Sequence, residues 1–568
     1  MKVFHPVSLL GMSVAAAVFS LPAMAQKPTT MTVLRVADAD TYDPIRTTST
    51  RMGEVMFMLA DTLVALDYDL KTVRPLLAEK WEVSEDGKTY RFTLRKDVKF
   101  CDGRPMTAED VAYSLKRLAD PENKSPIRNK VGPIKDVVVV DDYTIDYVLS
   151  APFSDTLYQL SLPFTSIVDR HAVEKLGKNF GTQGFNGTGP YCWGGWSPRQ
   201  QLVLNKNPHY NWGPPLYQNP APQIDQIIWK VVPESNTLMA AVQSRQGDSS
   251  QNVPTFALQN MQRMPGMQVR NQPAAIDDYF LGFRVNKPVM NDLAVRKAIN
   301  AALDRDTMVK AIYFGFADPR RSMANPNAVD YDPATLELMP AYDPQAAMAM
   351  LEEAGWKPGA DGIREKDGVR ASFLVYGSRN DVTARLAENM QANLRKVGID
   401  MRIQLWDNTA VWGKLATQEF DAFIMNLPYI TVSEWANFYF RSTQMPTPNR
   451  MNWDDKQTDE LAAQASAATT EAQRKEATSA LQRRLSEQAV WAPLVNVQLW
   501  SVSNDRVEGA SRMGCTGRRS TRGWICESRT EERRKNHDYY RDQECRVRRG
   551  LGCAGGAPHL SERCRCGL

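Results

Sequence analysis

Hydrophobic and polar positions follow two different periods along residues 30–510, one typical of strands and one typical of helices. Residues 81–94 alternate, with Tyr90, Phe92 and Leu94 on one face, and Asp86-Gly87 between the two halves predicts a hairpin turn. Residues 137–140 and 144–149 predict a second hairpin. Between the hairpins, Thr107 opens a predicted helix as its N-cap.

Further along the chain, a strand, a helix and a strand follow one another with short joints. Residues 371–376 predict the first strand, residues 383–397 an amphipathic helix and residues 399–405 the second strand, with Gly398 ending the helix. Such a βαβ unit requires a parallel sheet. Hairpins together with βαβ units predict an α/β architecture with two or more lobes.

The N-terminus has the pattern of a cleavable secretory signal. Met1-Lys2 is basic, residues 7–21 are mostly apolar, and Ala-x-Ala precedes Gln26, so residues 1–25 are expected to be removed. The alternative is an uncleaved membrane anchor. The first cysteine is Cys101, so the expected cleavage point offers no cysteine for lipid attachment. This pattern predicts a soluble protein of the periplasm.

The C-terminal residues 511–568 differ sharply from the rest of the chain. They hold 14 Lys or Arg against 7 Asp or Glu and six of the eight cysteines, without a sustained apolar period. We consider three explanations: a disulfide-stapled small domain, a basic interaction tail, or translation in a shifted reading frame, which the abrupt onset favours. No function is inferred from this segment.

Charge and motif content exclude several classes of protein. The 568 residues carry 69 Lys or Arg and 65 Asp or Glu, a net charge of +4, which argues against a nucleic-acid reader. Only His171 and His209 lie between residues 26 and 510, and no Cys-x2-Cys pair occurs, so we expect neither a metal site nor a cofactor. The chain has no Gly-x-Ser-x-Gly or His-Glu-x-x-His motif, so we predict no catalytic residues and no enzyme.

Four segments resemble the family 5 extracellular solute-binding proteins, the dipeptide and oligopeptide-type receptors of ABC importers. The most specific is residues 99–117, KFCDGRPMTAEDVAYSLKR. The others follow in the family's order: Gly187-Thr188-Gly189-Pro190-Tyr191 with residues 204–208, residues 292–299 with 303–305, and residues 504–509. The resemblance covers about residues 30–510.

The resemblance implies a type II periplasmic-binding-protein fold, with two lobes joined by a hinge and an extra domain packed on the first lobe. The expected boundaries are residues 26–70, 190–288 and 489–510 for lobe I, 71–189 for the extra domain and 289–488 for lobe II. Such a protein closes over its solute and is expected to be a monomer whose partners are inner-membrane ABC permease subunits with cytoplasmic ATPases. The implied solutes are peptides or peptide-like molecules. The alternatives are a sugar conjugate, a metal chelate or, in another class, a secreted hydrolase using His171 or His209.

Matching positions in the family give the candidate ligand contacts. Peptide-binding relatives place an aspartate, which pairs with the ligand's ammonium group, where this chain has Thr431. An offset alignment or Glu434 would restore that anchor. The complete set of candidate ligand contacts is Trp406, Tyr279, Phe280, Asp40, Tyr42, Tyr429, Thr431 and Trp435.

Two further features have expected structural roles. The segment from Asp102 to Asp110 is expected to be scaffold, with Gly103 making the turn and Pro105 stiffening it. Cys101 and Cys192 are candidates for a disulfide in an oxidising compartment, although the sequence does not show their separation.

Overall fold

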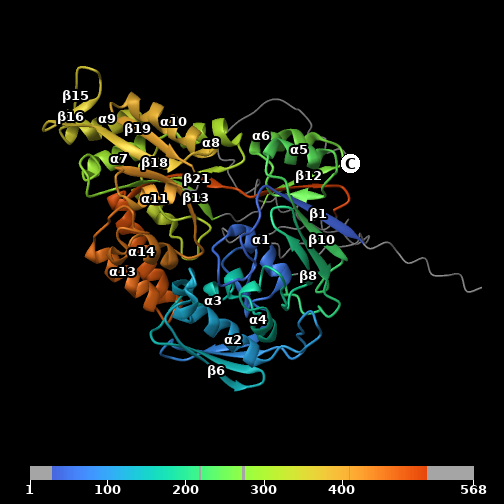
Figure 1. The fold of residues 1–568 in the computed structure, drawn as a ribbon. Helices are drawn as coiled ribbons and strands as arrows, with labels where there is room; N and C mark the ends of the chain where they lie inside the picture. The colour runs from blue at the N-terminus through green and yellow to red at the C-terminus, as the bar shows by residue number, and fades with distance from the viewer. Residues whose placement is uncertain (1–28, 217–218, 272–275, 408–409, 508–568) are drawn as a thin grey trace, which may run out of the picture.

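The computed structural model describes residues 29–216, 219–271, 276–407 and 410–507, and the expected signal peptide and the basic C-terminal segment lie outside these residues. The described chain forms three bodies, each built on one main sheet (Figure 1). We call them lobe I, on the seven-stranded sheet, lobe II, on the six-stranded sheet, and the extra domain, on the four-stranded sheet. The type II binding-protein architecture predicted from the sequence is confirmed.

Lobe I has helices on both faces of its sheet. In β1, Met31 and Val33 join a core shared with α1 (Thr50–Leu59), while Leu34 joins a core shared with α5 (Ser235–Gln243) and α6 (Thr255–Arg263). Successive strand residues point to opposite faces, so both faces are buried. The strand order is β12 (Met267–Asn271), β22 (Trp500–Asn504), β11 (Ser249–Ser250), β1 (Thr30–Arg35), β10 (Gln226–Val231), β9 (Gln201–Lys206) and β8 (Tyr191–Ser197).

Lobe II repeats this arrangement. Phe423 and Ile424 are neighbours in β20, yet they belong to two different cores on opposite faces of the sheet. The strand order is β14 (Asp318–Pro319), β21 (Trp491–Val497), β13 (Asp277–Phe283), β20 (Ala422–Pro428), β18 (Ser372–Ser378) and β19 (Asp400–Trp406). The helices are α7 (Leu293–Ala302), α8 (Arg305–Tyr313), α9 (Pro344–Glu353), α10 (Asp381–Lys396), α11 (Val411–Ala416), α12 (Val432–Tyr439), α13 (Lys456–Ala467) and α14 (Glu471–Gln488). A small sheet of β15 (Lys357–Pro358), β16 (Arg364–Lys366) and β17 (Val369–Arg370) completes the lobe.

The extra domain covers only one face of its antiparallel sheet. Phe92 and Leu94 are buried against α2 (Ala108–Ala119), whereas Val138 and Val140 on the other face are exposed. The strand order is β4 (Ala78–Val83), β5 (Thr89–Leu94), β7 (Thr144–Leu149) and β6 (Ile134–Asp141). Nearby lie the helices α3 (Thr156–Gln159) and α4 (Arg170–Leu176) and the strand pair β2 (Val64–Leu66) and β3 (Val73–Pro75).

The elements predicted from hydrophobic periodicity are present. Both predicted hairpins occur, β4 with β5 and β6 with β7, and Thr107 is the N-cap of α2. The predicted βαβ unit consists of β18, α10 and β19, and its two strands pair in parallel. The boundaries differ from the predictions by a few residues at most.

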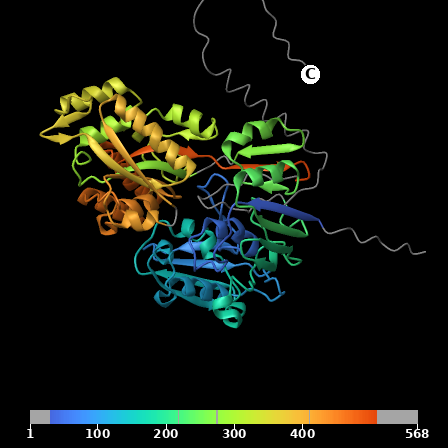
Figure 2. The same ribbon diagram turned by 45° about the horizontal axis from the view of Figure 1, so that its top comes forward.

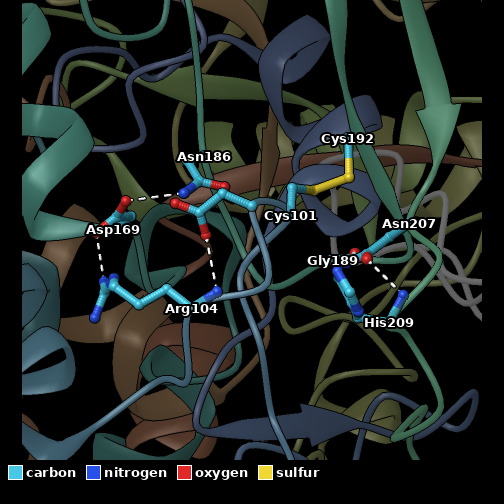
Figure 3. The surroundings of a disulfide bond; sticks show 9 residues. Cys101, Arg104, Asp169, Asn186, Gly189, Cys192, Asn207 and His209 are labelled. Atoms are coloured by element: carbon cyan, nitrogen blue, oxygen red, sulfur yellow. Dashed lines mark hydrogen bonds and ion pairs between the residues drawn. A yellow bond between two sulfur atoms is a disulfide. The ribbon is translucent and has the colours of Figure 1, made fainter.

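The segment around Asp102 is packed as a scaffold, as predicted. Gly103 has a φ of +88°, the left-handed region that favours glycine. Arg104 donates two hydrogen bonds to Asp110 at 2.7 and 3.0 Å. Arg104 also forms an ion pair with Asp169, which accepts a hydrogen bond from Asn186 (Figure 3). These contacts join the start of α2 to the region before α4.

A disulfide between Cys101 and Cys192 ties this scaffold to β8 of lobe I (Figure 3). The two Cα atoms are 5.7 Å apart, and 91 positions separate the cysteines in the sequence. Gly189 lies three residues before Cys192, and a Cβ atom at Gly189 would stand 2.3 Å from the carbonyl oxygen of Met58. The close approach of α1 therefore requires glycine here, and the extra domain is fixed to lobe I both covalently and by packing.

The two lobes are joined through the ends of their sheets (Figure 2). Along the chain, β12 of lobe I is followed by β13 of lobe II, and β21 of lobe II is followed by β22 of lobe I. The side chain of Asn271 donates a hydrogen bond to Gln498 at 3.1 Å, and Gln498 donates in turn to Asp318 at 2.8 Å. No helix within the described residues is both long and apolar enough to cross a bilayer.

Removing the disulfide is expected to destabilise the protein without changing its fold. Replacing Cys101 and Cys192 by serine opens a loop closed across 91 positions, and the loop-entropy model assigns about 4 to 5 kcal/mol to such a cross-link. Denaturant unfolding followed by circular dichroism measures the loss in the free energy of unfolding. A double-serine protein as stable as the native protein would show that packing alone holds this junction.

Candidate binding cleft

The edge of the lobe II sheet that faces the rest of the molecule is formed by the ends of three strands. β18 pairs in parallel with both β19 and β20, so the chain leaves all three strands at the same edge, after Ser378, Trp406 and Pro428. The antiparallel β13 begins there, because Asp277 lies opposite Pro428. Carboxyl ends of parallel strands are where α/β proteins place their ligands, so this edge is the candidate binding surface.

The loop after β20 is held in a defined shape by local hydrogen bonds. The Thr431 hydroxyl accepts a hydrogen bond from the Glu434 amide at 2.9 Å and so caps α12. The Glu434 carboxylate accepts from the Ile430 amide at 3.1 Å. Backbone bonds in both directions between Val329 and the segment 430–432 fix the loop to the preceding part of lobe II.

A cavity of about 20 Å³ lies between this loop and the bodies opposite. Lys130 and Leu162 of the extra domain, together with Ile276, face the loop across it; the complete lining is Lys130, Leu162, Ile276, Pro428, Tyr429, Ile430 and Glu434. This volume is enough for about one water molecule. The contact between the bodies therefore leaves no room for a solute at this point.

Opposite charges meet across the cavity. The Lys130 ammonium lies 3.0 Å from the Glu434 carboxylate, and it also lies 5.4 Å from the centre of the Phe438 ring. Both charged side chains are largely shielded from solvent, with 22% of Lys130 and 12% of Glu434 exposed. The ion pair links the extra domain directly to α12 of lobe II.

Beneath the loop lies a buried polar network that supports it. Asp278 forms an ion pair with Arg320 and accepts two hydrogen bonds of 2.9 Å from the Asn325 side chain. The Tyr429 hydroxyl accepts the Asn325 backbone N–H at 2.6 Å. Burial lowers the pKa of Arg320 and raises that of Tyr429. The network anchors Tyr429, which begins the loop, to the body of lobe II.

The candidate residues near α12 lie together but are buried. The Tyr429 and Trp435 rings are stacked with centres 5.8 Å apart, and Thr431 has no exposed surface. The Trp435 indole N–H has no hydrogen-bond acceptor among the described residues. In this conformation Tyr429 lines the cavity, whereas Trp435 packs in the core behind it. Their contact with a solute stays a prediction.

The other lobe II candidates occupy two strands. Phe280 is buried on Trp491, with ring centres 4.0 Å apart, and Tyr279 is partly buried against the opposite core. Trp406 ends β19, half-buried, with the Lys414 ammonium 4.5 Å from its ring centre. Trp406 lies on the edge strand of the sheet, two strands away from β20.

The lobe I candidates lie in the loop after β1. Tyr42 is fully buried, and its hydroxyl accepts a hydrogen bond from Arg35 at 2.6 Å. Asp38 forms an ion pair with Arg35 and accepts from the Trp196 indole at 2.8 Å, so the base of the loop is rigid. Asp40 is exposed and accepts from the Thr47 hydroxyl at 2.8 Å.

Two residues at this interface were not identified from the sequence. Lys130 lies at the end of a short 3-10 helix, and Asp155 precedes α3, in segments without a diagnostic motif. The residues of lobe II that they approach are about 300 positions away in the sequence, for example 304 positions between Lys130 and Glu434. Only the folded arrangement brings them together.

Comparison with known proteins agrees with this architecture. Residues 72–446 match the family described as bacterial extracellular solute-binding proteins, family 5 Middle. The chain is 27% identical over 529 residues to the glutathione-binding protein GsiB of Escherichia coli (strain K12), covering 91% of this chain and 98% of that protein.

Solved structures are similar over most of their length. NikA from Brucella suis, in complex with Fe(III)-EDTA, superposes with a TM-score of 0.77 at 25% identity, covering 88% of this chain and 100% of NikA. The periplasmic binding protein DppA from Helicobacter pylori, in complex with the peptide STSA, gives a TM-score of 0.70 at 22% identity over 88% of this chain and 98% of DppA. The latter likeness concerns the fold alone.

The network beneath the loop is expected to contribute strongly to stability. Asp278→Asn leaves the buried Arg320 without its counter-charge, which costs about 3 to 5 kcal/mol in the free energy of unfolding. The neighbouring Asp277→Asn is the matched control, because Asp277 is only partly buried and its loss is expected to cost about 1 kcal/mol. Chemical denaturation compares the two variants. Equal losses would contradict the role given to Asp278.

Proposed function

The chain belongs to family 5 of the bacterial extracellular solute-binding proteins, and we propose that it is the solute-binding component of an ABC import system for peptides or peptide-like solutes. The observation that carries the proposal is the family match over residues 72–446. The likeness to the glutathione-binding protein GsiB over 91% of the chain supports a solute with peptide character.

Binding in this proposal couples to closure of the cleft. A cavity of about 20 Å³ admits no peptide, so the solute enters an open form, and the lobes then close around it with the two sides of this cavity farther apart than they stand here. A solute favours closure only to the extent that it makes better contacts in the closed form than in the open one. The hinge is placed where the chain passes between β12 and β13 and between β21 and β22. The boundaries expected from the sequence give lobe I residues 26–70, 190–288 and 489–510, the extra domain 71–189 and lobe II 289–488. A hinge at these two crossings moves β13 and β21 to lobe II, in whose sheet they are paired.

The charges that face the cavity suit a zwitterionic solute. Thr431 is engaged in capping α12, and Glu434 is the nearest carboxylate on the cavity wall. We assign the solute's ammonium group to Glu434 and a solute carboxylate to Lys130, so that solute charges replace the ion pair of 3.0 Å. An ammonium group buried without such a partner would be costly. Trp406, Tyr279 and Asp40 are proposed as further contacts in the open form.

The remaining functional assignments follow from the family. The protein is proposed to act as a monomer in the periplasm after removal of residues 1–25, and to deliver its solute unchanged to inner-membrane permease subunits with cytoplasmic ATPases. We propose no catalytic residues and no enzymatic activity for this protein. A metal chelate is the second candidate solute, because NikA was solved with Fe(III)-EDTA and is 25% identical.

A thermal-shift panel tests the solute class. We expect dipeptides, tripeptides or glutathione to raise the melting temperature of the purified protein, because a ligand that binds only the native state stabilises it. At 100 times the dissociation constant the gain is about 2.7 kcal/mol. Stabilisation by Fe(III)-EDTA alone would move the assignment to metal chelates. Turnover of a panel compound that disappears on replacing His171 or His209 would contradict the receptor function.

The contribution of Trp406 is tested with the panel compound that binds most tightly. Trp406→Ala is expected to weaken its binding about tenfold, which corresponds to about 1.4 kcal/mol of lost aromatic contact. Trp412→Ala is the matched control, because Trp412 is 54% exposed on the neighbouring α11. Isothermal titration calorimetry measures both affinities. Equal affinities of the two variants would remove Trp406 from the site.

A further inference from the structure

The extra domain contacts lobe II at a second place, next to the start of α3. Ser154 donates its backbone N–H to the carbonyl of Ser466 at 2.8 Å and its hydroxyl to the carbonyl of Ala465 at 2.7 Å. Both acceptors lie at the C-terminal end of α13. Figure 1 shows α13 and α14 beside the extra domain. The two bonds therefore hold the extra domain and lobe II together in the closed form.

The next residue, Asp155, is the unusual one at this contact. Its exposed fraction is 0%, and no described residue donates a hydrogen bond of ordinary distance and angle to either of its carboxylate oxygens. Asp155 belongs to the extra domain, yet the hydroxyl groups of Thr431 and Ser433 at the start of α12 lie in its surroundings. A buried carboxylate that is so poorly hydrogen-bonded is costly, and its neutral, protonated form costs less.

We propose that Asp155 makes the contact between the extra domain and lobe II a proton-sensitive latch, which closes more firmly when this carboxyl group is protonated. The Ser154 bonds to α13 and the Lys130–Glu434 pair hold the two bodies in register, and they place the Asp155 carboxyl against the N-terminal end of α12. Separation of the bodies returns Asp155 to water, where the charged form is stable.

The electrostatics agree with this geometry. Burial raises the pKa of Asp155 to about 6 from the usual 3.8, and the nearby Glu434 adds to the increase. The hydroxyls of Thr431 and Ser433 and the Arg474 guanidinium lower the pKa in part. The closed form thus binds a proton at a higher pH than the open form does. Closure is therefore favoured as the pH falls through 6 and opposed above it.

The charged groups around Asp155 are largely engaged elsewhere. On α12, Glu434 is paired with Lys130, and on α14, Arg474 lies 2.6 Å from Asp330. From the extra domain, Tyr90 and Tyr158 face Asp155, and its charge contributes to the raised pKa of both hydroxyls. Arg474 is the nearby cation, but Asp330 is its ion-pair partner, so the Asp155 charge is incompletely compensated.

The inference rests on the proposed closure of the cleft but not on the identity of the solute. It is tested without a solute, by pulsed EPR on the full chain. Spin labels attached to an unnatural amino acid at positions 80 and 456, both exposed, report the distance between the extra domain and lobe II without using cysteines. The closed population is measured from pH 4 to pH 8.

The closing constant is expected to fall about 60-fold from pH 4 to pH 7.5, as a pKa of about 6 in the closed form against 3.8 in the open form requires. Asp155→Asn, which keeps the shape without the charge, is expected to remove most of this dependence and to remain closed at pH 7.5. Asp142→Asn, an exposed carboxyl in the β6–β7 turn, is the matched control and is expected to behave as the native protein does.

Two outcomes would overturn the inference. One is a closed population in the native protein that does not change between pH 4 and pH 8. The other is an Asp155→Asn protein that keeps the native pH dependence. If Asp155→Asn does not fold, carbon-detected NMR titration of the native protein measures the pKa of Asp155 directly, and a value near 3.8 would also overturn the inference. A failure of the solute panel leaves these measurements unaffected.

Discussion

The constraint that governs this structure is the burial of both faces of both large sheets. In lobe I, neighbouring residues of β1 serve two separate cores, and in lobe II, Phe423 and Ile424 do the same. Because the faces are covered by helices, the lobes meet only at strand ends and the loops that follow them. This contact contains the loop from Tyr429 to Glu434, whose Ile430 packs in the hydrophobic cluster of lobe I. The same constraint that stabilises each lobe thus leaves their junction free to open.

The extra domain makes this junction asymmetric. It is fixed to lobe I by the Cys101–Cys192 disulfide and by close backbone packing at Gly189. Its contacts with lobe II are non-covalent, and they include Ile430 of lobe II in the same hydrophobic cluster as Leu162. Lys130 pairs with Glu434, and Ser154 donates to the end of α13. Lobe I and the extra domain therefore behave as one side of the cleft and lobe II as the other. Polar contacts of this kind exchange readily with water, which suits a contact that has to break.

Local sequence patterns predicted the scaffold because its determinants lie close together in the chain. The β4–β5 hairpin needs only an alternating pattern and an Asp-Gly turn, and the βαβ unit needs only its periodicities and Gly398. The disulfide remained undecided, because spacing does not give the distance between two cysteines. The resemblance to the family supplied the architecture that periodicity alone left as a general α/β fold.

The interface residues were harder to predict, because their environment comes from remote segments. Phe280 and Trp435 have aromatic side chains of the kind that stack on ligands. In the closed form, however, both pack in the core of lobe II. Nothing around Asp155 in the sequence indicates that α12, nearly 280 positions later, buries it. Trp406 and Asp40, by contrast, keep exposed surface at the ends of their strands or loops.

The water-sized cavity has a kinetic consequence. A solute larger than water does not fit between Lys130 and Glu434 as they stand here, so its entry and its escape both require these two sides to separate. The residence time of a bound solute is then set by the rate at which the two sides separate. Solutes of different chemistry that are enclosed equally well would therefore share one dissociation rate.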